Sequence, residues 1–239
     1  MPIVPAFRRF TESPDAPYRL GRHQVHDALP PRLAAVVDHT EPIKTVEHEE
    51  FVPPFDQGRI GSCTANAALG TLVTAPYGHA GVAYTEDDAV ELYELETKLD
   101  DSQIPGNYPP DDTGSTGPWS MQALEKRGLI HSFRHARDLA TALRMLNTGP
   151  ISIGVTWYNA MFTPDATNAI HADPSSGIGG GHQVCIVGND VENKRIRIRN
   201  SWGTSWGDNG HAWLSWADFG ALLRDGGDVV QPILNGASA

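Results

Sequence analysis

Asp56-Gln57-Gly58-Arg59-Ile60-Gly61-Ser62-Cys63-Thr64-Ala65-Asn66-Ala67-Ala68-Leu69-Gly70 is the stretch that decides the fold of this chain. Two glycines and a polar turn lead into alanines and a leucine, which are good helix formers, so a helix should begin near Ser62 or Cys63. The unpaired N–H groups and the dipole at a helix start favour an anion, and they shift a thiol toward the thiolate that attacks carbonyl carbon. Taken alone, the stretch more often means a small buried cysteine inside a helix.

Two later stretches change that interpretation. The first is Gly180-Gly181-His182-Gln183-Val184-Cys185-Ile186-Val187-Gly188, in which a histidine follows glycines at the head of an apolar strand. The second begins at Ile198 and contains Asn200-Ser201-Trp202-Gly203. A cysteine in a glycine turn, then a histidine after glycines, then Asn-Ser-Trp-Gly, come in this order with fitting separations, and three such pieces are hard to obtain by chance.

Length and charge limit the classes of function. The 239 residues suffice for one large domain or for two lobes that share a cleft. With 18 basic and 29 acidic residues, the net charge is −11. No block of lysines or arginines occurs, so we expect no nucleic-acid partner.

Cysteine usage and the amino terminus bear on location. Cys63 and Cys185 are the two cysteines of the chain, which therefore is not a disulfide-built secreted scaffold. Met1 to Phe10 lacks a charged segment followed by an apolar stretch, and no run approaches membrane-spanning length. We therefore expect a cytoplasmic protein with no membrane association, and association with a phage or virion is also compatible with the sequence.

Residues 1–45 read as an arm that precedes the domain. They hold seven of the 18 prolines and few regular patterns, which predicts an extended segment laid along a surface. The remaining residues, 46–239, should form the domain. Whether the arm inhibits the domain, braces it or binds a partner stays open at this point.

The sequence pattern of the domain changes from helical to strand-like near its middle. Helices are predicted over 63–74, 86–99, 118–126 and 137–147, which makes 56–147 a helical lobe. A short strand is predicted within 45–54, and the polar loop over 100–117 is long enough to suggest that it shapes a site. Beyond 148 the patterns are short, β-branched or alternating, and they predict a β-rich lobe over 148–239. Its predicted strands are 151–155, 184–187, 195–199 and 211–216.

A helical first half and a β-rich second half make an α+β fold. A cleft between two such lobes would hold Cys63 on one wall and His182 on the other. The chain resembles the papain family of cysteine peptidases, in a short bacterial or phage-like form, over about residues 46–219. The resemblance rests on the three motifs quoted above, and it implies a two-lobed fold with a helical N-terminal lobe, an antiparallel β-barrel-like C-terminal lobe and an active-site cleft between them.

The resemblance also implies the role of each site residue. Cys63 would be the nucleophile, His182 its general base and later acid, and Asn200 the group that holds the imidazole. Gln57 would donate its side-chain amide to the oxyanion, together with the Cys63 backbone N–H. Trp202 would cover the bond between Asn200 and His182. The implied activity is hydrolysis of peptide bonds through a thioester acyl-enzyme.

Three glycines and Trp202 are expected to contact the substrate. Gly114 and Gly117 lie in a loop at the place where the family has a glycine segment that pairs with substrate backbone. Gly181 would let the substrate approach His182 closely. We expect a peptide or protein substrate, and no cofactor.

The chain also departs from the family. Secreted members have a disulfide-forming cysteine three residues before the nucleophile, where this chain has Ile60. Their aromatic residues after the nucleophile are replaced by Thr64 and Asn66. These departures leave room for two alternatives: a catalytically silent binding or structural protein, such as an assembly component, and a cysteine-dependent amidase or acyl transferase.

Two histidines could be taken for a pair of metal ligands. His131 and His135 have the spacing of two ligands on one helix face, but no glutamate follows the first histidine and no third ligand is evident. We therefore expect no metal site.

Overall fold

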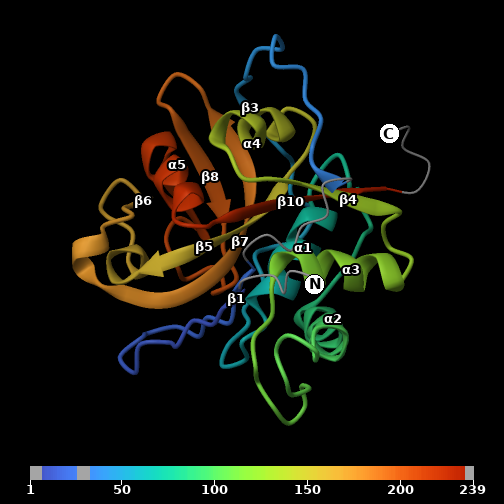
Figure 1. Cartoon of the computed structure of the whole chain (residues 1–239). Coiled ribbons are helices and arrows are strands. Elements are labelled where there is room, and N and C mark those ends of the chain that lie inside the picture. Colours follow the sequence, from blue (N-terminus) through green and yellow to red (C-terminus); the bar gives the residue numbers. More distant parts are fainter. Residues whose placement is uncertain (1–6, 26–32, 235–239) are drawn as a thin grey trace, which may run out of the picture.

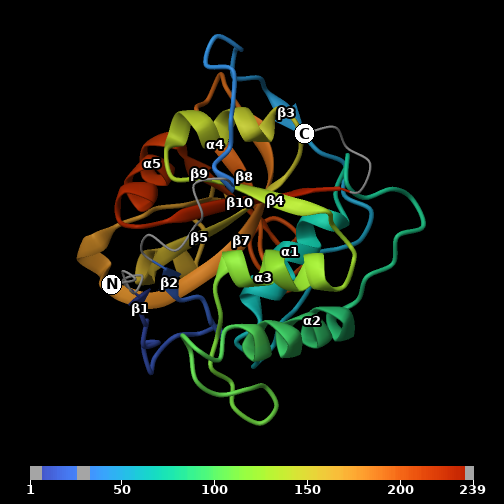
Figure 2. The same ribbon diagram turned by 45° about the vertical axis from the view of Figure 1, so that its right-hand side comes forward.

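The computed structural model describes residues 7–25 and 33–234, and the other residues of the arm and the last five residues lie outside the described part. The helices are α1 (Cys63–Leu72), α2 (Glu86–Leu99), α3 (Gly117–Lys126), α4 (Leu139–Leu146) and α5 (Trp216–Arg224). The strands are β1 (Phe7–Arg8), β2 (Gln24–Val25), β3 (Val46–Glu47), β4 (Ser132–Ala136), β5 (Ile151–Tyr158), β6 (Ala169–Ile170), β7 (Ile178–Asp190), β8 (Arg195–Arg199), β9 (His211–Ser215) and β10 (Asp228–Ile233). Figures 1 and 2 show α1, α2 and α3 gathered on one side of the molecule, with α4 and α5 on the other.

Helix α1 is the buried centre of the helical side. Every one of its residues is buried, because they are small or apolar all round the helix. It packs against α2, α3 and the long strand β7. The helix begins at Cys63, as the sequence predicts, and this position places the sulfur beside the sheet.

The other helices begin and end at recognisable signals. α2 covers the predicted range, and it starts with a capping box in which Thr85 and Asp88 satisfy each other's backbone N–H groups. α3 has a proline in its first turn, and Gly128 at φ +70° follows its end. Asp138 caps α4 by accepting from the backbone N–H of Thr141.

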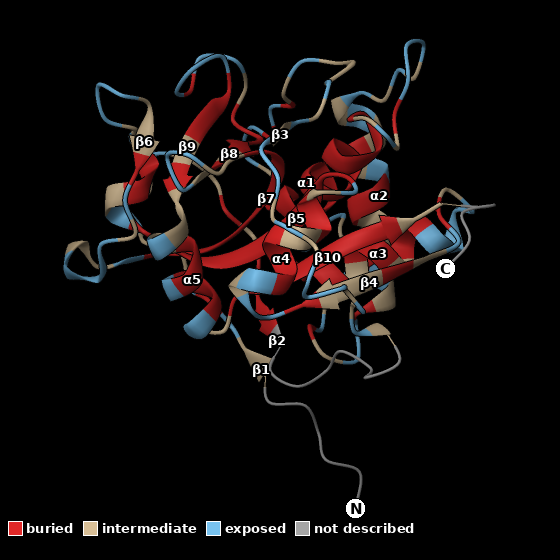
Figure 3. Ribbon diagram, turned by 90° about the horizontal axis from the view of Figure 1, so that it is seen from above, coloured by how far each residue is buried: buried red, intermediate tan, exposed pale blue. Residues whose placement is uncertain are grey.

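The second half of the chain forms most of an eight-stranded sheet. Strand β7 lies at its centre, between β5 and β8, and both pairings are antiparallel. β10 and then β4 extend the sheet on the β5 side, whereas β9 and a short parallel β6 extend it on the β8 side. Figure 3 shows that β5 and β7 are buried along most of their length, although both strands also carry polar residues such as Ser152 and His182.

Two apolar clusters give the molecule its two lobes. One fills the space between α1, α2 and α3, with Tyr93, Met121 and Leu124 fully buried. The other lies on the sheet and includes Trp157 and Phe219. This α+β arrangement agrees with the predicted fold class.

The boundary between the lobes differs from the predicted division at 147/148. α4 was expected to join the helical lobe, but Leu143 and Leu146 belong to the apolar cluster of the sheet. The reason is that α4 packs on β7, α5 and β5, whereas its contacts with α1, α2 and α3 are at most weak. Strand β4, also within 56–147, pairs with β10 and is therefore part of the sheet.

Several elements were not predicted. β4, α5 and β10 carry mixed polar and apolar residues that gave no clear period, and the strand predicted within 45–54 is only the two residues of β3. His131 and His135, considered as a pair on a helix, lie instead next to and within β4. In that strand, neighbouring side chains point to opposite faces, so the helical spacing has no meaning there.

The two lobes are joined where the chain before α1 meets the turn after β8. Asp56 and Trp202 form an antiparallel bridge, Gln57 N–H donates to Ser201 O at 2.9 Å, and Gly203 N–H donates to Phe55 O at 2.9 Å. Arg199, at the end of β8, supports this junction from behind. Its guanidinium pairs with Glu50 and donates to the carbonyls of Val52 and Pro53.

We predict that Arg199→Met lowers the free energy of unfolding by about 3 kcal/mol, because it leaves two carbonyls without their donor and the partly buried Glu50 with His211 as its remaining partner. The matched control is Arg197→Met on the same strand. Arg197 pairs with Glu47, whose side chain is 65% exposed, so its loss should cost under about 1 kcal/mol. Urea unfolding of both variants checks this, and equal effects would contradict it.

Candidate active site

The start of α1 and the middle of β7 bring Cys63 and His182 to the same place. Cys63 is the first residue of α1, and α1 packs directly on β7. The backbone N–H of Gln183, which follows His182, is hydrogen-bonded to the Cys63 sulfur. The cysteine and histidine that are 119 positions apart in the sequence are therefore neighbours across the junction of helix and sheet.

His182 is held by Asn200 and by aromatic rings. Its Nε2 lies 2.8 Å from Asn200 Oδ1, which makes Nε2 the protonated nitrogen because an amide oxygen only accepts. Trp202 stacks on the imidazole with ring centroids 4.7 Å apart, and Trp157 meets it edge-on at 4.8 Å. Nδ1 is buried and has no hydrogen-bond partner among the described residues, so it is the nitrogen left for proton exchange.

Gln57 is fixed in a defined orientation. Ser201 Oγ donates to Gln57 Oε1 at 2.6 Å, which turns the amide nitrogen the other way. That nitrogen donates to the carbonyl of Ile60 at 2.8 Å and to the carbonyl of Leu20 at 3.3 Å. A peptide carbonyl of the arm therefore lies where the sequence analysis expects an oxyanion to form.

Residues 7–25, the first of the two described parts of the arm, pass through the cleft. The two ends of this segment are held together by the short antiparallel pair β1 and β2. Between them, Gly21 and Arg22 donate their N–H groups to Gly181 O, while Ser115 donates to Gly21 O and accepts from His23 N–H. The arm was predicted as an extended segment along a surface, and the structure shows that this part is instead extended between the two lobes.

Side chains of the arm fill the cleft as well. Leu20 is fully buried and joins the apolar cluster of the sheet. Tyr18 stacks on Trp202 with ring centroids 4.4 Å apart at 7°. Arg22 forms a buried ion pair with Asp228. The arm is thus held by apolar, aromatic and ionic contacts at once. Cys63 has no exposed surface, and the charges of the arm residues Glu12 and Arg22 are close enough to act on its thiol.

Three of the four predicted substrate contacts lie against the arm. A side chain at Gly114 or at Gly181 would run into the arm backbone, and Trp202 Nε1 donates to Arg19 O at 3.2 Å. The fourth, Gly117, opens α3, and a Cβ there would meet the buried side chains of Gln183 and Asp228. Gly117 is therefore a packing position, because only a residue without a side chain fits between α3 and the sheet.

Burial changes the proton affinities of the site. We expected the helix start to lower the pKa of Cys63, but burial under the arm raises the pKa of this thiol well above its ordinary value, although Gln183 N–H opposes the rise. Burial also lowers the pKa of His182 to about 4, and the bond to Asn200 only partly offsets this. With the arm in place, the pair is consequently a neutral thiol beside a neutral imidazole.

Sequence reasoning missed the residues that hold the arm and the loops together. Asp112, from the loop before α3, accepts from Gly61 N–H, from Tyr93 O–H and from the arm residue Arg19. Ser115 pairs with the arm through its backbone, which leaves no side-chain signal. The two adjacent aspartates at 111–112, inside a glycine-containing loop, were the one sequence feature that indicated a negatively charged side of the cleft.

Comparisons with known proteins agree with this geometry. The family model described as papain family cysteine protease matches residues 107–219. The family model, the viral relative and the solved structures below are all similar to this chain and support a relationship to the C1-type, papain family. An uncharacterized peptidase C1-like protein of Acanthamoeba polyphaga mimivirus is 26% identical over 237 residues, and the match covers 80% of this chain and 75% of that protein.

Solved structures show the papain-like fold across nearly the whole chain. Xylellain, a cysteine protease from Xylella fastidiosa, superposes with a TM-score of 0.65 at 20% identity, over 91% of this chain and 97% of that one. A recombinant stem bromelain precursor gives a TM-score of 0.56 at 15% identity, over 80% and 72%. The proform of a ragweed pollen cysteine protease, Amb a 11, gives 0.55 at 16% identity, over 82% and 68%.

Two features are absent from the described residues. No helix within 7–25 and 33–234 is both long and apolar enough to cross a membrane. Within the same ranges, no three or more His, Cys, Asp or Glu side chains form a group that could hold a metal ion.

We predict that Gly21→Ala displaces the arm. Gly21 has φ +144°, and a Cβ there would overlap the carbonyl of Gly61. Since overpacking of this kind typically costs about 1–3 kcal/mol, alkylation of Cys63 by iodoacetamide should become roughly tenfold faster or more. The alkylation rate should also reach half its maximum at lower pH, because opening the cleft removes the burial that raises the thiol pKa.

The matched control for this prediction is Gly81→Ala. Gly81 also has a positive φ, +99°, but a Cβ there meets nothing within 4 Å. Its alkylation rate should equal that of the unsubstituted protein. Equal rates in the Gly21 and Gly81 variants would mean that the arm does not control access to the sulfur.

Proposed function

We propose that this papain-like protein is a cysteine peptidase that acts through Cys63, His182, Asn200 and Gln57, and that its own arm keeps the cleft closed. One observation carries the proposal. Asn200 fixes His182 with Nδ1 left over, while the Gln57 amide already donates to a peptide carbonyl in the same cleft. This is the set of groups that acyl transfer from a peptide bond requires.

The chemistry proceeds in two steps. In the open form, His182 takes the thiol proton of Cys63, and the sulfur attacks the substrate carbonyl, whose oxygen becomes negative next to the Gln57 amide and the Cys63 backbone N–H. The C–N bond then breaks, His182 gives its proton to the leaving amine, and a thioester remains on Cys63. His182 next removes a proton from water, which attacks the thioester and releases the acid and the thiol.

The arm fits this proposal as an inhibitor of the site. It takes the backbone positions that an extended substrate needs, at Ser115 and Gly181, and its Leu20 carbonyl takes the Gln57 amide. Two of the similar solved structures are described as a precursor and a proform, which supports a closed state for this chain as well. The arm also contributes buried Leu20 and Arg22 to the packing, so it braces the lobes at the same time.

A thiol-probe experiment tests the peptidase activity. With Gly21→Ala as the background, an epoxide or iodoacetamide probe should label Cys63 under reducing conditions, and a general peptide substrate should be hydrolysed. Cys63→Ala should abolish labelling at that position and lower turnover by about a millionfold. The control Cys185→Ala removes a buried thiol that lies on the middle of β7, and turnover should persist in it.

Different results separate the alternatives. Labelling of Cys63 without hydrolysis would favour a binding or structural protein. Transfer to added amines that outruns hydrolysis would favour an acyl transferase. Turnover that survives in Cys63→Ala would contradict the assigned nucleophile.

We further predict that Ser201→Ala lowers kcat more than it changes KM. Without the bond from Ser201 Oγ, the Gln57 carboxamide can rotate away from the oxyanion, and that interaction matters chiefly in the transition state. We expect a loss of about tenfold, less than the roughly 10²–10³ for removing an oxyanion donor by Gln57→Ala. Ser205→Ala, at an exposed turn residue in the same segment, is the control and should leave both constants unchanged.

A further inference from the structure

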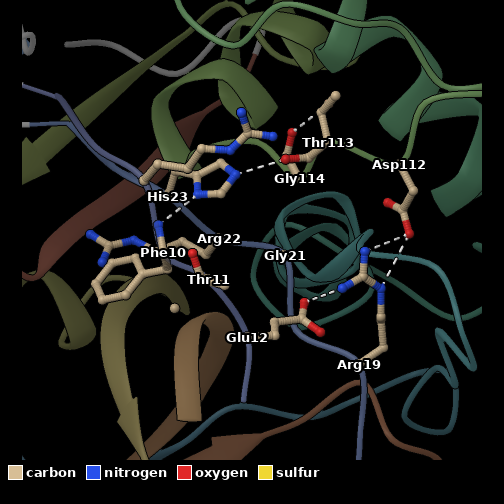
Figure 4. A pocket seen from close by; sticks show the side chains of 12 residues that line it. Phe10, Thr11, Glu12, Arg19, Gly21, Arg22, His23, Asp112, Thr113 and Gly114 are labelled. Carbon is tan, nitrogen blue, oxygen red and sulfur yellow. Dashed lines mark hydrogen bonds and ion pairs between the residues drawn. The ribbon is translucent and has the colours of Figure 1, made fainter. Parts of the chain in front are cut away.

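The cleft wall carries a carboxylate that the arm neutralises. A cavity of about 350 Å³ lies between the arm and the wall, and Figure 4 shows the residues around it. Asp112, Thr113, Gly114 and Gly181 come from the body of the protein, and the other described lining residues come from the arm. Among these four wall residues, Asp112 is the charged one.

The arm places a guanidinium against that carboxylate. Nε and Nη2 of Arg19 both donate to Asp112 Oδ2, at 3.2 and 2.9 Å. Arg19 also pairs with Glu12, another residue of the arm, as the dashed lines in Figure 4 show. Burial opposes the charge on Arg19, but its bonds to Glu12 and Asp112 outweigh this and raise its pKa. If the arm leaves, Arg19 and Glu12 leave together, and Asp112 faces the cleft without its cation.

Asp112 lies next to the position where a peptide bond would be attacked. Its oxygens accept from Gly61 N–H at 3.0 Å, and Gly61 is two residues before Cys63. Along its own loop, Asp112 is two residues before Gly114 and three before Ser115, which binds extended backbone. The arm residue after Arg19 is Leu20, whose carbonyl accepts from Gln57. The carboxylate is thus within one side-chain length of a carbonyl held at the oxyanion position.

We propose that Asp112 makes this cleft select peptides with an arginine side chain at the residue before the one that supplies the attacked carbonyl, and that Arg19, which precedes Leu20 in the arm, occupies the subsite in the closed form. This inference rests on the peptidase activity proposed above. An arginine fits because its guanidinium brings several donors on a stem long enough to span the groove, as Arg19 does. The other side of the carboxylate stays engaged with Gly61 and Tyr93, so its position is fixed before a substrate arrives.

The test compares two substrates in the full-length protein. They are peptides of one sequence with arginine or its uncharged isostere citrulline at the second residue before the cleaved bond. The arm blocks both peptides alike, so the ratio of their kcat/KM values does not depend on how often the cleft is open. We expect a preference of roughly tenfold for arginine, because the carboxylate is partly exposed and its charge is partly screened.

Asp112→Asn should reduce this ratio to about one, because it removes the charge. The amide oxygen still accepts from Gly61 N–H and Tyr93 O–H, so hydrolysis of the citrulline peptide should persist. Asp111→Asn is the matched control: it removes the same charge from an exposed neighbour that does not line the cavity, and the ratio should stay at its original value. A ratio of one in the unsubstituted protein, or a ratio that Asp112→Asn leaves intact, would overturn the proposal.

A readout without turnover separates this inference from the proposed activity. Peptidyl chloromethyl ketones with arginine or citrulline as the next-to-last residue should alkylate Cys63 at rates that differ by the same factor, as measured by mass spectrometry. Equal hydrolysis of the two peptides would overturn the subsite and leave the peptidase activity standing. Selective alkylation without hydrolysis of either peptide would support the subsite and count against the peptidase activity.

Discussion

The antiparallel contact between residues 55–57 and 201–203 is the constraint on which the rest of the site depends. It joins the chain before α1 to the turn after β8 by backbone hydrogen bonds, and it therefore fixes one lobe against the other. Gln57 and Ser201 lie in this contact, and Asn200 directly precedes it. Because the same few residues join the lobes and orient the amide and the imidazole, the site cannot loosen without the lobes separating. Arg199 reinforces the contact from the buried side.

Desolvation sets the protonation state of Cys63, the proposed nucleophile, and the arm controls desolvation. A helix start contributes about 0.3–1 kcal/mol toward an anion at an exposed site. Complete burial of a thiol acts in the opposite direction and is the larger effect, so the pKa of Cys63 rises under the arm. The arm therefore lowers the reactivity of the sulfur in two ways: it excludes substrate, and it keeps the proton on the thiol. Removing it would restore the helix start as the dominant influence.

The sequence was sufficient for the parts of the structure with strong local signals. The helices at 86–99 and after Cys63 were predicted because capping residues and small or periodic apolar residues mark them. The three motifs name residues that the structure brings near one another across α1, β7 and the turn after β8. β4 and β10 were missed because Arg134, His135 and Gln231 interrupt any period, and their pairing is a long-range event that local pattern cannot show. The lobe assignment of α4 failed for the same reason, since its packing partner is 40 residues away on β7.

The path of the arm through the cleft could not be read from its composition, because prolines and scattered apolar residues describe an extended segment wherever it lies. What fixes it is complementarity with residues far along the chain: Leu20 with the sheet core, Tyr18 with Trp202, and Arg19 with Asp112.

The departure at Ile60 explains why a charged residue is found at the cleft wall. Secreted members of the family tie this loop with a disulfide, and in its absence another interaction must hold the loop that leads into Cys63. Asp112 does this by accepting from Gly61 N–H while Tyr93 O–H holds the same carboxylate. A hydrogen-bonded carboxylate differs from a disulfide in one respect that matters for function: it is anionic, so the wall attracts a cation. The side chain that stabilises the loop is thereby the side chain that would distinguish one peptide from another, and the arm matches it with Arg19.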